Sequence, residues 1–65
     1  MSLDTTEAIL ARIREAGYDV EAGTAGYQVR MVATGPDGQP HEVTRPSEHE
    51  AAVALAEAVR IDPRA

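Results

Sequence analysis

The side chains best suited to chemistry in this 65-residue chain are two histidines, each followed by a glutamate, in the pairs His41-Glu42 and His49-Glu50. Imidazole and carboxylate together form a donor set that zinc accepts. The spacing is not that of a His-Glu-x-x-His motif, and local geometry places no third or fourth ligand. We therefore expect no metal site and no cofactor, with His41 in an edge strand and His49 as a solvated side chain in the first turn of a helix.

The two serines are the candidate nucleophiles. Ser47 precedes Glu50 by three residues, which is the spacing of a capping box, and this motif uses the serine hydroxyl to bind the backbone. No Gly-x-Ser-x-Gly elbow surrounds Ser47, and a catalytic base with its orienting group needs a larger scaffold. The chain has no cysteine, which excludes thiol chemistry and disulfides and indicates a reducing, cytoplasmic compartment. The sequence predicts a protein that is not an enzyme.

Two glycine-bearing segments, 23–26 and 35–38, have the composition of phosphate-binding loops. Such a loop must lead into the N-terminus of a helix, whereas each of these segments separates two runs of alternating apolar and polar residues. The segment 35–38 reads Gly-Pro-Asp-Gly, which is typical of a type I turn closed by a glycine bulge. We interpret both segments as hairpin turns.

Hydrophobic periodicity predicts five elements. Apolar spacings of three and four predict helices over about 5–16 and 48–60, the first beginning at a cap on Asp4 and ending at Gly17, the second capped by Ser47. Alternation with a period of two predicts strands over about 18–22, 27–34 and 40–45. The order predicts an α+β fold: one small domain, 1–65, with a three-stranded antiparallel sheet and two helices packed on one face, in the order α-β-β-β-α.

The predicted turns also give a strand register. A four-residue loop at 23–26 pairs Val20 with Val29, and the second turn pairs Met31 with Val43, so the apolar face is continuous across three strands. The opposite, outer face then carries mostly polar side chains: Asp19, Glu21, Gln28, Arg30, Val32, Glu42 and Thr44.

Charge and aromatic content disfavour a nucleic-acid partner. A net charge of −5 repels a polyanion unless basic side chains cluster, and the six arginines are spread along the chain. Base stacking needs aromatic rings on an open sheet face, yet the only two aromatic residues, Tyr18 and Tyr27, point to the core side in this register. The uncharged apolar run 51–56 is far shorter than the roughly 20 residues of a membrane-spanning helix, so we expect no membrane role.

The order of elements, together with the run SEHEAAVALA at 47–56, resembles the double-stranded RNA-binding domain. That family has the α-β-β-β-α topology, and its last helix begins with a serine followed by lysines that contact phosphates and then by an alanine-rich stripe. The corresponding positions here are Glu48, His49 and Ala52, so the charge is reversed, and the family's Gly-Pro-x-His loop is matched only by Gly-Thr-Ala-Gly at 23–26. The resemblance implies the fold and carries over no RNA-contact residue.

Without those lysines, the electrostatic term that supplies most non-specific duplex affinity is missing. The predicted function is therefore a small acidic, non-catalytic module for protein interaction or regulation, whose partner is another protein or a second copy of the chain. The alternative is a degenerate nucleic-acid binder, similar to the double-stranded RNA-binding domain, that uses a local arginine patch. Candidate contact residues lie on the outer sheet face and on the exposed side of the last helix: Arg30, Val32, Val53, Glu57 and Arg60.

Overall fold

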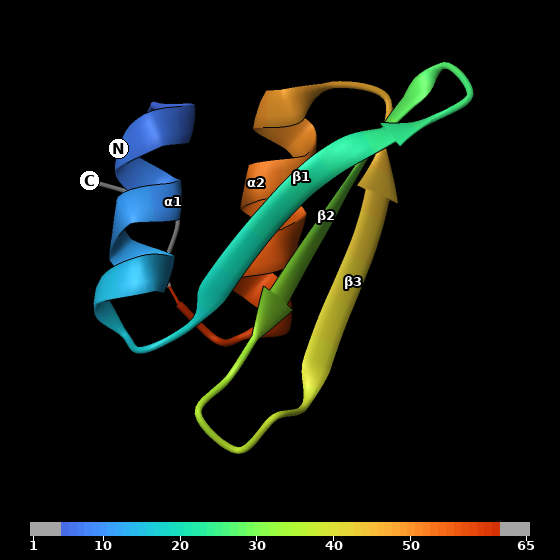
Figure 1. Cartoon of the computed structure of the whole chain (residues 1–65). Helices are drawn as coiled ribbons and strands as arrows, with labels where there is room; N and C mark the ends of the chain where they lie inside the picture. Colours follow the sequence, from blue (N-terminus) through green and yellow to red (C-terminus); the bar gives the residue numbers. More distant parts are fainter. Residues whose placement is uncertain (1–4, 62–65) are drawn as a thin grey trace.

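The computed structural model describes residues 5–61 of the chain. Five elements follow one another: α1 (Thr6–Glu15), β1 (Asp19–Ala25), β2 (Gln28–Thr34), β3 (Pro40–Arg45) and α2 (Glu48–Ala58) (Figure 1). The strands form one antiparallel sheet in the order β1-β2-β3. Helix α2 packs against β2 and β3, and α1 contacts both α2 and β1. The predicted fold class is confirmed.

The core lies between the helices and one face of the sheet. Its largest fully buried side chains are Ile9 and Ile13 of α1, Met31 of β2 and Leu55 of α2. The remaining buried residues are small: Ala33, Val43, Ala51, Ala52 and Ala56. Because most buried side chains of α2 are alanines, this helix approaches the sheet closely.

Both helices begin at a hydroxyl cap. The Oγ1 of Thr5 accepts a hydrogen bond from the N–H of Ala8 at 3.2 Å, and the Oγ of Ser47 accepts one from the N–H of Glu50, also at 3.2 Å. The predicted cap at Ser47 is confirmed. The cap of α1 is Thr5 and not Asp4, which lies outside the described residues.

Helix α1 ends in a Schellman motif. The N–H of Gly17 donates to the carbonyl of Arg14 at 2.9 Å, and the N–H of Tyr18 donates to the carbonyl of Ile13 at 3.4 Å. Gly17 has a φ of +99°, the left-handed backbone that this motif requires. The chain then turns directly into β1.

Helix α2 ends in the same motif with an arginine at the left-handed position. The N–H of Arg60 donates to the carbonyl of Glu57 at 3.1 Å, and the N–H of Ile61 donates to the carbonyl of Ala56 at 2.8 Å. Arg60 has a φ of +61° and is the only non-glycine residue with a positive φ in the described part of the chain. The helix therefore ends at Ala58, two residues before the predicted end.

The β2–β3 hairpin matches the prediction. Met31 pairs with Val43 as expected. The N–H of Gly38 donates to the carbonyl of Gly35 at 2.9 Å, and Gly38 has a φ of +81°. These are the features of a type I turn followed by a glycine bulge, so the turn chemistry at 35–38 gave the correct register.

The β1–β2 hairpin differs from the prediction. Val20 pairs with Ala33 and not with Val29, and the turn contains only Gly26 and Tyr27. Gly26 has a φ of +65° while that of Tyr27 is not positive, which matches a type II′ turn with glycine at its first central position. β1 is therefore longer than predicted, and the prediction that Tyr27 points to the core side is wrong, because this residue forms the tip of the hairpin.

Candidate functional site

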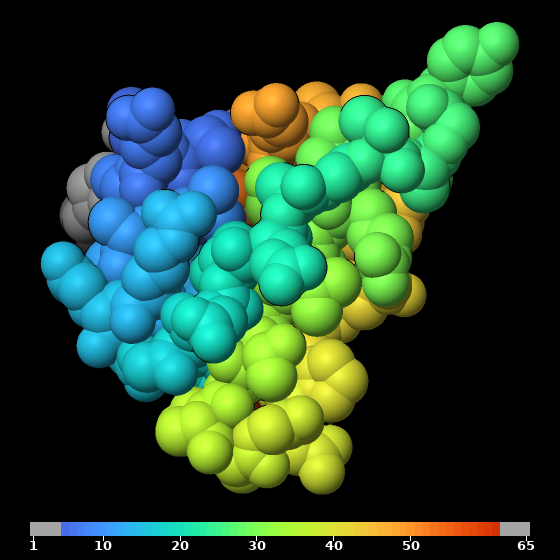
Figure 2. All heavy atoms as spheres, in the orientation of Figure 1, coloured from blue at the N-terminus to red at the C-terminus, as the bar shows by residue number. Residues whose placement is uncertain are grey.

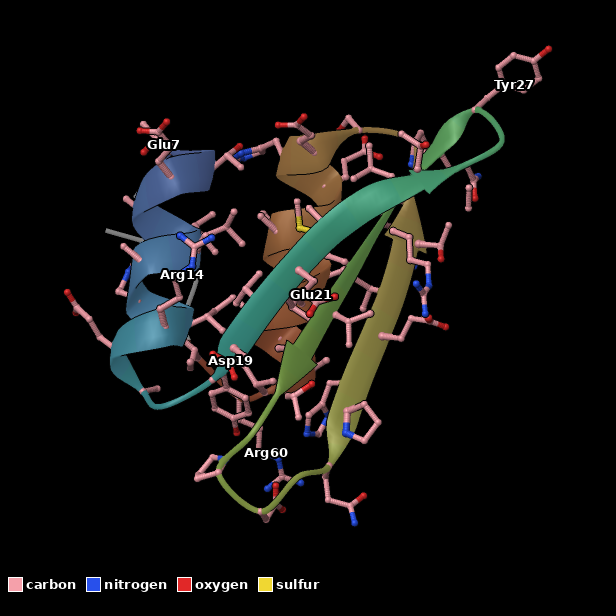
Figure 3. All side chains as sticks on the ribbon, in the orientation of Figure 1. Glu7, Arg14, Asp19, Glu21, Tyr27 and Arg60 are labelled. Atoms are coloured by element: carbon pink, nitrogen blue, oxygen red, sulfur yellow. The ribbon has the colours of Figure 1, made fainter. Side chains whose placement is uncertain are left out.

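The most exposed feature of the molecule is the ring of Tyr27. Its relative accessibility is 104%, and it is the only exposed large hydrophobic residue in the described part of the chain. The β1–β2 hairpin projects beyond the helices, and the ring points away from the body of the protein (Figures 2 and 3). Two paired seven-residue strands hold the turn that carries the ring. The aromatic ring is therefore carried by a paired hairpin and packs against no other residue in the part of the chain that the structure describes.

The other tyrosine, Tyr18, is a packing residue. A Cβ built on Gly35 lies 3.1 Å from the Cε2 of Tyr18, so the ring occupies the space that a side chain at position 35 needs. The ring also meets His41 edge to face, with centroids 6.1 Å apart. Tyr18, just before β1, thus packs against Gly35, just after β2, and against the half-buried His41 of β3.

His49 is not the solvated side chain that the sequence predicted. It is half-buried, and its Nδ1 lies 3.0 Å from the Oγ1 of Thr6, at the start of the other helix. This hydrogen bond joins the N-terminal turns of α1 and α2. Among residues 5–61, no group of three or more histidine, aspartate or glutamate side chains is placed to hold a metal ion.

The outer sheet face carries the charges that the sequence placed there. Arg30 of β2 forms an ion pair with Glu42 of β3, and about half of each side chain is exposed, 53% and 49% respectively. Val32 pairs with Glu21 on one side and Glu42 on the other. The half-buried Val32 thus lies between two carboxylates, that of Glu21 on β1 and that of Glu42 on β3.

The predicted contact residues form two separate patches. Arg30 and Val32 lie on the outer sheet face, whereas α2 packs against the opposite face. Val53 is half-buried against the core, and Glu57 and Arg60 are exposed. The structure therefore does not bring the five residues together.

Tyr27 is the residue that the sequence reasoning missed. The signal lies in Gly26, which supplies the positive φ of a two-residue turn. The segment Gly-Thr-Ala-Gly at 23–26 interrupts the apolar alternation, which is why the sequence predicts a four-residue loop there. A Gly-Tyr turn placed between two alternating runs predicts an exposed ring at the tip.

The surface of residues 5–61 contains no pocket. None of the helices in this range is both long and apolar enough to cross a membrane. No known family model matches the sequence, and no match is found among curated proteins or solved structures.

Proposed function

We propose that this chain is a non-catalytic protein-interaction module that binds its partner through Tyr27 at the tip of the β1–β2 hairpin. The full exposure of this ring on a tight turn is the observation that carries the proposal. Tyrosine offers a large contact area at a small cost in side-chain entropy, and it is enriched among the few residues that dominate binding energy. Because the ring packs against nothing else in residues 5–61, contact with a partner is the role that accounts for it.

The outer face of the sheet, which continues from the hairpin tip into the body of the protein, suits the rim of a protein interface. The outer sheet face is polar and open, with Val32 as its large apolar residue and Glu21, Arg30 and Glu42 around it. Interfaces commonly place an aromatic anchor near a rim of polar, solvated groups. The predicted contact residues Arg30 and Val32 thus remain part of the proposed surface.

The test compares wild-type protein with Tyr27→Ser. The matched control is Gln39→Ser, a substitution at an exposed position of the other hairpin turn. A protein captured from an extract of the source cells is titrated against each of the three proteins by calorimetry. We expect it to bind wild type and the control equally and to bind Tyr27→Ser about 30-fold more weakly. This ratio corresponds to a hot spot of about 2 kcal/mol. All three proteins should unfold at similar urea concentrations. A search in which no protein distinguishes wild type from Tyr27→Ser overturns the proposal.

The second candidate is a nucleic-acid binder similar to the double-stranded RNA-binding domain, and the observed α-β-β-β-α order favours it. The start of α2 opposes it, because Glu48 is exposed there, His49 is bonded to Thr6 and Ala52 is buried. An NMR titration with a short RNA duplex at low salt separates the two candidates. Shifts at 23–26 and 48–52 that disappear with added salt support RNA binding, and an unchanged spectrum excludes it.

A further inference from the structure

The two edge strands of the sheet are protected to different degrees. β3 begins at Pro40 and is followed directly by Pro46, and proline has no N–H to offer a neighbouring strand. β1 contains no proline and no basic residue. Its charged side chains are Asp19 and Glu21, helix α1 contacts it (Figure 1), and all of its residues except Val20 are exposed. Because no proline interrupts its N–H groups, the edge of β1 is the less protected of the two and is the one on which another strand can pair.

Gly23, in the middle of β1, has no explanation within the described chain. Its φ is not in the left-handed region, and a Cβ built at this position meets no atom within 4 Å. Glycine inside a strand is destabilising relative to alanine, so a side chain at this position would improve the strand. Glycine in a strand often marks the close approach of another chain.

The register shows which backbone groups face the free edge of β1. The tight turn closes on the pair Ala25 and Gln28. In an antiparallel pair every second residue directs its N–H and C=O away from its neighbour, and counting back from the turn these residues are Val20, Ala22 and Thr24. A second copy of β1 can pair antiparallel with the first so that Ala22 lies opposite Ala22 and Val20 lies opposite Thr24. The free N–H and C=O groups of all three residues then have partners in the other copy.

The same register brings opposite charges together. Glu21 lies opposite Gly23 of the second copy, and Gly23 pairs with Arg30 of its own β2. The Cα atoms of Glu21 and that Arg30 are then two strand spacings apart, about 9.5 Å. Arg30 is already paired with Glu42, but about half of its side chain is exposed, and because Gly23 has no side chain the carboxylate of Glu21 can reach the guanidinium as a second acceptor. Sliding the pairing so that Glu21 faces Glu21 places like charges opposite each other, which is unfavourable.

We propose that the chain forms a homodimer by antiparallel pairing of β1 with β1 of a second copy, centred on Ala22, so that two three-stranded sheets become one six-stranded sheet. Glu21 of each copy pairs with Arg30 of the other across Gly23. The register also places Ala25, next to the turn that carries Tyr27, opposite Asp19 of the second copy. The inference rests on the proposed function and names its partner as a second copy of this chain.

The first experiment is analytical ultracentrifugation of the whole chain in about 150 mM salt, where a Debye length of about 8 Å screens the net charge of each copy. Strand-pairing interfaces are small, so concentrations should extend to about 1 mM. We expect wild type to reach twice the chain mass of 6.9 kDa. Ala22→Pro removes an N–H that faces the free edge of β1, so this variant should stay folded by circular dichroism and remain monomeric.

The matched control is Thr44→Pro, which makes the same change on the free edge of β3 and should leave the dimer intact. If wild type is monomeric at every concentration, the proposed dimer is wrong. That result leaves the proposed function standing, because binding of another protein through Tyr27 is tested separately with Tyr27→Ser. A dimer that persists in folded Ala22→Pro, or is lost in Thr44→Pro as well, overturns the assignment to β1.

The second experiment tests the register with Glu21→Arg and Arg30→Glu. Each variant alone places like charges on both sides of Gly23, and we expect at least tenfold weaker association for each. Mixing the two variants restores both opposite-charge contacts between the copies, so a heterodimer should form at least tenfold more tightly than either variant alone. Its affinity should stay below that of wild type, because Arg30→Glu also loses the ion pair with Glu42 in its own chain. Failure of the mixture to associate more tightly than either variant alone overturns the register.

Discussion

Two residues in the same backbone state differ in what they cost the fold. Gly17 and Arg60 occupy the left-handed position after α1 and α2, with φ of +99° and +61°. Glycine adopts this backbone without steric cost, whereas a residue with a Cβ pays roughly 1 kcal/mol or more. Helix α2 therefore ends at a strained residue, held there by the hydrogen bonds from Arg60 and Ile61.

At this scale we predict that Arg60→Gly stabilises the protein. Release of the strain should raise the free energy of unfolding by about 0.5–1 kcal/mol, after the greater freedom of glycine in the unfolded chain is subtracted. Urea unfolding followed by circular dichroism measures the change. Arg60→Ala keeps the Cβ and should give no such gain, and Gly17→Ala should lower the stability by about 1 kcal/mol. Equal stability of Arg60→Gly and Arg60→Ala would contradict the explanation.

The elements show what the sequence could and could not predict. The β2–β3 register followed from the turn at 35–38, whose proline and glycines allow only a few geometries. The β1–β2 register could not be predicted in this way. A shift of the pairing by an even number of residues keeps the same side chains on each face, so the predicted register and the observed one both place Val20 on the core face. Gly23 and Gly26 both resemble turn residues, and only the backbone shows that Gly23 is strand and Gly26 is turn. The exposure of Tyr27 depended on this choice and was missed with it.

At the element scale we predict that α2 depends on its cap. Ser47→Ala removes the acceptor for the N–H of Glu50 and should lower the free energy of unfolding by about 1 kcal/mol. Ser47→Asp supplies another good acceptor at the same position and should keep most of the wild-type stability. Urea midpoints of the three proteins check this. Similar losses in both variants would mean that the Ser47 hydroxyl is not acting as a cap.

At the scale of the molecule, few side chains hold the fold together. Among residues 5–61, four of the nine buried residues are alanines, and the large fully buried ones are Ile9, Ile13, Met31 and Leu55. A chain of 65 residues is expected to have about 3–10 kcal/mol of stability. Each large core residue thus accounts for a substantial part of the total.

We therefore predict that Ile13→Ala removes much of the stability. A fully buried isoleucine truncated to alanine costs about 2–5 kcal/mol, so the variant should unfold at a much lower temperature or be largely unfolded at 37 °C. Ile13→Val should cost only about 0.5–1.5 kcal/mol. Thermal unfolding by circular dichroism compares the two. A loss below 1 kcal/mol in Ile13→Ala would show that the interface between α1 and α2 is loosely packed.

The contrast between the two tyrosines also gives this protein two separate optical signals. Tyr18 packs over Gly35 and beside His41, whereas the ring of Tyr27 is surrounded by solvent. The chain has no tryptophan to accept energy from either ring, so the fluorescence of both phenols is observed directly. The emission of Tyr18 reports whether the chain is folded, and that of Tyr27 reports whether the hairpin tip is covered. In Tyr27→Phe the only tyrosine is Tyr18, so unfolding is read from one ring alone, and the difference from wild type gives the emission of Tyr27 without any added dye.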